Sequence, residues 1–178
     1  MVQMLASAYM TLFRIVHIMA GIAWGGSVYL LVTYVQPSAA AIGPAGAPFM
    51  MELLGKRRLV DGLIGLGSVT VIGGLFLYWH DWHAYGSFGN WIDSRFGVTI
   101  TIGAVSAIVA LAFGIFGTRP NVKRLLTLAR QVAASGGPPS PEVAQQIARI
   151  QRLLKILARV SLGFIGFAAL CMAAGRYL

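Results

Sequence analysis

The sequence predicts an all-α protein: an integral membrane bundle of four transmembrane helices, with a cytoplasmic helical hairpin between the third and the fourth. Of the 178 residues, 57% are hydrophobic and only 11% are charged, whereas about a quarter of the residues in soluble domains are charged. The apolar residues form four long runs, and they do not alternate with polar residues as in barrel strands. This composition excludes a disordered chain and a typical soluble enzyme, and the single cysteine, Cys171, excludes a disulfide scaffold.

Each apolar run is close to the ~20 residues that a helix needs to cross a bilayer. We expect the spans, within one membrane domain covering 1–178, at about 7–36, 59–79, 97–117 and 160–177. Pro37 should close the first span, because proline lacks the backbone donor that a helix interior needs. A loop rich in glycine, alanine and proline should follow at 37–48.

The basic residues predict the orientation of these spans. Of the 14 lysines and arginines, three follow the first span at 56–58 and eight lie between the third and fourth spans. The other three are Arg14, Arg95 and Arg176. The residues between those two spans are Arg119, Lys123, Arg124, Arg130, Arg149, Arg152, Lys155 and Arg159. Because basic loops stay in the cytoplasm, both termini should lie outside, and we expect a multi-pass protein of the bacterial cytoplasmic (inner) membrane.

The segment at about 120–159 carries the pattern of two amphipathic helices joined by a tight turn. Ser140 is a capping residue, Pro141 suits the first helical position and Glu142 is an acid in the first turn, so a helix should begin here. Nothing interrupts it before 177, which predicts a helix longer than the bilayer is thick. The two helices should pack as an antiparallel hairpin, although a basic face that lies on anionic lipid or on a partner subunit remains open.

Polar chemistry is sparse in this chain. Five acidic residues are too few for a carboxylate metal cage, and the sequence has no phosphate-binding loop, serine triad or metalloprotease motif. The basic residues are explained by topology and are not interleaved with aromatic residues, so we expect no binding of nucleic acid. The tryptophans near 79–91 fit an aromatic belt at the membrane surface. Histidine is therefore the main candidate for chemistry.

Two histidines are predicted at similar depth near the outer face. His17 lies about one turn inside the first span, with Arg14 three residues earlier, and His80 ends the second span. An ionisable residue within a span is costly and suggests a function. Two histidines within roughly a turn of each other could ligate a b-type haem, and Arg14 could pair with a haem propionate.

Other interpretations of these residues stay open. His17 could simply form a hydrogen bond between helices. Copper is a second possibility, with Met10 as a soft ligand beside His17, His80 and His83.

The stretch from Arg14 to Gly26, with His17, Trp24 and Gly25 in it, resembles the first helix of a group of small membrane proteins. The group comprises the copper-resistance D-type proteins, the membrane domain of cytochrome-linked urate oxidases and the four-helix bacterial protoporphyrinogen oxidases. The resemblance implies that His17 is a haem ligand and that Arg14 and Trp24 belong to the cofactor-binding stretch. It covers about one helix. The second histidine of the oxidase type and a cytochrome c motif are missing, so urate oxidation is not implied.

From these features we expect a membrane protein that binds haem b, or serves electron transfer, near its outer face. The candidate cofactor-binding residues are His17, His80, Arg14 and Trp24, and the candidate metal ligands are His17, His80 and Met10. One alternative is a non-catalytic accessory subunit of a respiratory or photosynthetic complex, with other membrane subunits or further copies of the chain as partners. Copper handling is a second alternative. No catalytic residue is predicted.

Overall fold

In the computed structural model, residues 2–177 are described, with side chains from residue 8 onward, and this part of the chain is helical without strands. Four helical stretches are long and apolar enough to cross a membrane. They contain the helices α1 (Val2–Leu30), α4 (Leu59–Ala84), α6 (Arg95–Ala112) and α8 (Pro141–Gly175). The predictions of an all-helical chain and of four membrane-length helices are confirmed.

Pro37 does not close the first helix. After α1 the chain makes a π-helical turn, η1 (Leu31–Val35), and continues directly as α2 (Gln36–Ala41). The amide of Gln36 donates to the carbonyl of Leu31, five residues earlier. This wider turn brings Pro37 into the first turn of α2, where a missing backbone donor costs little.

The predicted loop at 37–48 is largely helical. After α2 come a 3-10 turn η2 (Gly43–Ala45), the helix α3 (Gly46–Met51) and a second π-helical turn, η3 (Glu52–Lys56). Gly46 lies so close to the backbone of Ala39 that a Cβ there would overlap its carbonyl. Glycine is therefore required where the chain reverses between α2 and α3.

The third membrane helix also continues beyond its predicted end at 117. A π-helical turn, η4 (Phe113–Thr118), joins α6 to α7 (Arg119–Ser135), so that helix extends unbroken over Arg95–Ser135. Pro120 falls in the first turn of α7 and is tolerated there. Gly136, with φ +66°, ends α7.

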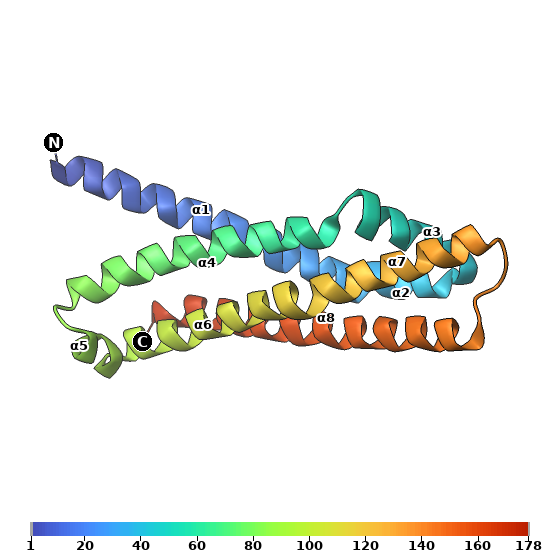
Figure 1. Ribbon diagram of the computed structural model, residues 1–178. Helices are drawn as coiled ribbons and strands as arrows, with labels where there is room; N and C mark the ends of the chain where they lie inside the picture. The colour runs from blue at the N-terminus through green and yellow to red at the C-terminus, as the bar shows by residue number, and fades with distance from the viewer. Residues whose placement is uncertain (1, 178) are drawn as a thin grey trace.

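The four membrane-length helices pack as two antiparallel pairs, α1 with α4 and α6 with α8, as Figure 1 shows. A buried cluster joins the pairs in the middle of the molecule and consists of Trp24, Val28, Leu31, Leu63, Ala110 and Ile165. A second cluster unites the start of α4 with α7 and α8 through Val60, Val122, Ile150 and Leu154. In Figure 1, α7 lies beside the first half of α8 at this end, which we call the basic end.

Small residues allow the close approach within each pair. A Cβ at Gly67 would lie 2.8 Å from the Trp24 ring, and one at Gly103 would lie 2.8 Å from the Cβ of Cys171. In a lipid environment such contacts replace the hydrophobic force that drives packing in water. Gly62 and Gly65 have no neighbour within 4 Å and contribute nothing of this kind.

The opposite end, which we call the aromatic end, contains the connection between α4 and α6. α4 continues five residues beyond Trp79 and stops at Ala84, just before Gly86 with φ +78°. A short helix, α5 (Phe88–Asp93), follows, with Ser87 as its capping residue. Trp91 of α5 is 0% exposed and forms edge-to-face contacts with the rings of Tyr78, Tyr85 and Phe96. This tryptophan packs against protein and does not belong to a lipid-facing belt.

The start of α8 agrees with the sequence. The hydroxyl of Ser140 accepts a hydrogen bond from the amide of Val143, Pro141 occupies the first turn, and Glu142 is the acid of that turn. The helix then runs to Gly175 without a break. Figure 1 shows α1 beginning and α8 ending at the aromatic end, as expected for an even number of spans.

Candidate functional site

The candidate site lies on the contact between α1 and α4, whose register follows from three pairs of neighbours. Phe13 stacks on Phe76, with ring centroids 5.1 Å apart. His17 lies against Gly73 and Gly74, and Trp24 lies against Gly67. The two helices are therefore antiparallel, and residues nearer the start of α1 lie beside residues nearer the end of α4.

His17 is anchored to the facing helix. Its Nδ1 lies 2.7 Å from the backbone carbonyl oxygen of Thr70. A carbonyl can only accept, so Nδ1 carries the proton and donates this hydrogen bond. The hydroxyl of Thr70 donates to the carbonyl of Leu66, 2.9 Å away, which satisfies the threonine within its own helix. The bond fixes both the tautomer and the orientation of the imidazole.

Two glycines of α4 make room for the imidazole. A Cβ on Gly74 would lie 2.8 Å from Cε1 and 3.1 Å from Nδ1 of His17, distances that real side chains avoid. A Cβ on Gly73 would lie 3.4 Å from the Cβ of His17. Without this glycine pair, the ring could not approach the Thr70 carbonyl in its present position.

The second ring nitrogen of His17 is chemically available. Nε2 has no hydrogen-bond partner among the described residues, and it lies farther from Gly74 than the other two ring atoms, at 3.8 Å from a Cβ built there. Since Nδ1 holds the proton, Nε2 carries a free lone pair. The side chain is half-buried, so its lone pair lies at the edge of the α1–α4 contact.

Arg14 and Met10 lie farther out on α1. Arg14 is exposed one turn from His17 and belongs to no ion pair among the described residues. Met10 is partly exposed and lies seven residues from His17, about 10 Å along the axis. The part of Met10 as a metal ligand beside His17 stays a prediction.

His17 and His80 lie at different levels of the α1–α4 contact, and their joint ligation of a haem stays a prediction. His17 lies beside Gly74, and His80 follows six residues later, about 9 Å along α4 and well over a turn away. The register instead puts Met10 level with His80. Nδ1 of His80 lies 3.2 Å from the carboxylate of Asp81 at an exposed position. His83 donates through Nδ1 to the carbonyl of Trp79, 2.7 Å away.

Trp24 belongs to the interior of the protein. It is 6% exposed and forms part of the buried cluster that joins the two helix pairs. The structure therefore explains this residue by packing, and a contact with a cofactor stays a prediction. Among the described residues, no group of three or more histidine, cysteine, aspartate or glutamate side chains could hold a metal ion.

No protein-family model, curated protein or solved structure matches this chain.

His17 is recognisable as a candidate from the sequence, but the residues that position it are not. The hydrogen bond uses a backbone carbonyl, which leaves no trace in the choice of residue at position 70. The signal that was present is the Gly73-Gly74 pair, because adjacent glycines in an apolar span mark a close approach by another group.

Proposed function

We propose that the chain is an integral membrane protein that binds one haem b through Nε2 of His17 and takes part in electron transfer. The observation that carries this proposal is the hydrogen bond from Nδ1 of His17 to the Thr70 carbonyl. Histidines that bind metals typically donate their other ring N–H to a carbonyl or carboxylate, which fixes the ring and raises its basicity. His17 has this arrangement.

The residues around His17 fit such a group in part. One imidazole with a free Nε2 can supply an axial ligand, and the exposed Arg14, one turn away, can pair with a propionate. His80 lies about 9 Å farther along α4. We assign one axial ligand to this chain, because only His17 is held by a hydrogen bond to the facing helix. A bound haem would provide a centre that accepts and releases one electron.

The orientation that we propose puts the basic end in the cytoplasm. Lys56, Arg57 and Arg58 lie there with the basic residues of α7 and α8. Basic segments remain on the cytoplasmic side during insertion, and His17 would then lie in the outer half of a bacterial inner membrane. The α7 and α8 segments at the basic end would form the cytoplasmic hairpin.

The test is an absorption spectrum of the full chain, expressed with sufficient haem and purified in mild detergent. A Soret band should be present in the wild type, absent in His17→Ala and retained in His80→Ala. The His80 variant is the matched control, because it removes an exposed imidazole that lies about 9 Å farther along α4. A wild-type protein without haem, or equal loss in both variants, would contradict the proposal.

A second candidate function is an accessory subunit of a larger membrane complex. It is favoured by residues 9–22 of α1. This part of the helix packs on α4 but leaves large apolar side chains exposed, namely Tyr9, Leu12, Ile15, Val16, Ile18, Met19 and Ile22. A partner helix could cover this face as well as lipid could. Extraction in gentle detergent should then yield a stable partner, whose association is weakened by Ile18→Asn. Recovery of the chain alone would exclude this alternative.

A further inference from the structure

We propose that the basic end binds anionic phospholipid along one face of α8. This inference is independent of the haem proposal and rests on uncompensated charge. Four of the basic residues at this end are paired, since Glu52 binds Lys56 and Arg57, and Asp61 binds Arg58 and Arg119. Seven exposed basic residues have no ion pair with any described acid, namely Lys123, Arg124, Arg130, Arg149, Arg152, Lys155 and Arg159.

Three of the unpaired charges form a stripe on α8. Arg152, Lys155 and Arg159 are three and four residues apart and therefore share one face of the helix. The residues that α8 buries in the protein, Ile150 and Leu154, lie on the opposite face. The stripe thus points away from α7 and toward the surroundings of the molecule.

An exposed apolar stripe accompanies the basic one. Each basic residue directly precedes a large apolar residue that is exposed, and these residues are Leu153, Ile156 and Val160. The apolar surface of the membrane-crossing half of α8 therefore extends about two turns toward the basic end on this side. A phospholipid matches this pairing, because its acyl chains can cover the apolar stripe while its phosphate meets the arginines and the lysine.

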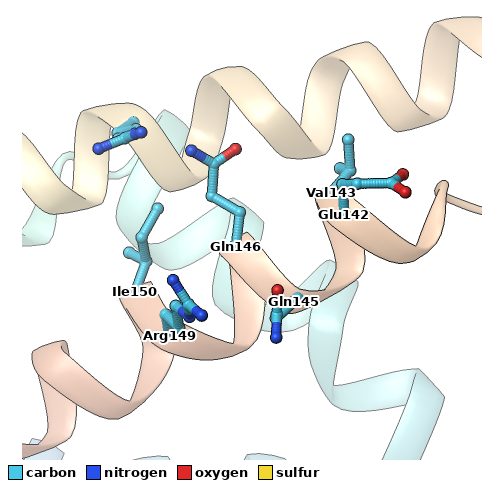
Figure 2. Close-up of a pocket in the computed structure, with 7 residues that line it drawn as sticks. Glu142, Val143, Gln145, Gln146, Arg149 and Ile150 are labelled. Carbon is cyan, nitrogen blue, oxygen red and sulfur yellow. The ribbon is translucent and has the colours of Figure 1, made fainter.

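The other unpaired charges lack the apolar partner. Lys123, Arg124 and Arg130 of α7 are exposed, but no large apolar residue of α7 is exposed beside them. Arg124 and Arg149 line a surface groove of about 440 Å³ between α7 and α8, which Glu142 also lines. Figure 2 shows Glu142 near the start of α8 and Gln146 projecting toward α7. An acid and two amides make the groove less suited to an anion than the α8 stripe.

The experiment measures lipid binding to the purified full chain by native mass spectrometry. The probes are dioleoyl phosphatidylglycerol and dioleoyl phosphatidylcholine, which differ in headgroup charge but not in their acyl chains. The wild type should prefer phosphatidylglycerol. R152Q/K155Q/R159Q should weaken its binding by on the order of 10- to 100-fold, since each basic residue near a membrane surface contributes about a fivefold preference. Binding of phosphatidylcholine should not change.

The matched control is K123Q/R124Q/R130Q, which removes the same charge from α7. It should change phosphatidylglycerol binding by less than about fivefold. Equal loss in both triple variants, or no preference in the wild type, would overturn the proposal and would point to diffuse charge or to a soluble acidic partner. R159Q alone, with helicity checked by circular dichroism, should show a smaller loss of the same kind. An unchanged affinity in R159Q and in the α8 triple variant would also overturn it.

Discussion

The imidazole of His17 on α1 is hydrogen-bonded to the backbone carbonyl of Thr70 on α4, 2.7 Å away. This bond connects two helices far apart in sequence and gives the histidine a single tautomer. It also distinguishes His17 from the other two histidines, which bond to groups of their own helix, Asp81 and the Trp79 carbonyl. Only His17 is therefore fixed in place by a neighbouring helix.

Gly74→Ala should destabilise the α1–α4 contact. The new Cβ would lie 2.8 Å from Cε1 of His17, and the ring cannot move away without losing its bond to Thr70. We expect a loss of about 1–3 kcal/mol in the free energy of unfolding, as for other overpacked sites. Thermal unfolding in detergent, followed by circular dichroism, measures it.

Gly62→Ala is the control for that prediction. It adds the same methyl group to the same helix at an exposed position with no neighbour within 4 Å. Its stability should equal that of the wild type or exceed it slightly, because alanine favours helix. If the two variants unfold at the same temperature, the contact between Gly74 and His17 has no energetic weight.

Trp91→Ala should be among the most damaging substitutions at the aromatic end. The side chain is 0% exposed, so its removal leaves a cavity between Tyr78, Tyr85 and Phe96 and should cost about 3–5 kcal/mol. Trp91→Phe should cost less, because the indole Nε1 has no hydrogen-bond partner among the described residues. Trp79→Ala serves as comparison: Trp79 is 56% exposed, and a loss as large as that of Trp91→Ala would refute this account of the aromatic end.

Gly103→Ala should open the contact between α6 and α8 and expose Cys171. The added Cβ would lie 2.8 Å from the Cβ of Cys171, so the two backbones must separate. Cys171 is the chain's one cysteine and it is buried, so its rate of modification by a maleimide reports the separation directly. We expect slow labelling in the wild type and in the control Gly163→Ala, because a Cβ at Gly163 would have no neighbour within 4 Å. Labelling of Gly103→Ala should be at least about tenfold faster, since a barrier lowered by 1.4 kcal/mol gives that factor. Unchanged labelling would argue against close packing at Gly103.

The four membrane-length helices could be predicted because apolar runs of this length have one common solution in lipid. Their ends could not. Pro37 is predicted to end the first span, but the π-helical turn η1 precedes it and brings it into the first turn of α2. The turn η4 does the same for Pro120 at the start of α7. A π-helical turn has no clear sequence signature, so proline alone gave the wrong boundary at Pro37.

The sequence predicts His17 as the candidate residue, but it does not predict which residues of α4 lie beside it. His17 stood out because an ionisable residue in a span is costly. The ends of the apolar runs predict a similar depth for His80, but α4 runs to Ala84, well beyond the predicted end at 79. The true register comes from close contacts at Gly67, Gly73 and Gly74. Which glycines make such contacts depends on how the helices cross, and Gly62 and Gly65, alike in sequence, make none.

The central claim is that Nε2 of His17 binds haem iron, and chemical rescue tests it most directly. His17→Gly removes the imidazole, so the purified variant should lack the Soret band that we expect in the wild type. Free imidazole at millimolar concentration, added with haem, should restore a band in this variant and should have no such effect in His80→Gly, which keeps its haem throughout. A wild-type protein that takes up no haem, or a His17→Gly variant that keeps its haem without imidazole, would contradict the claim.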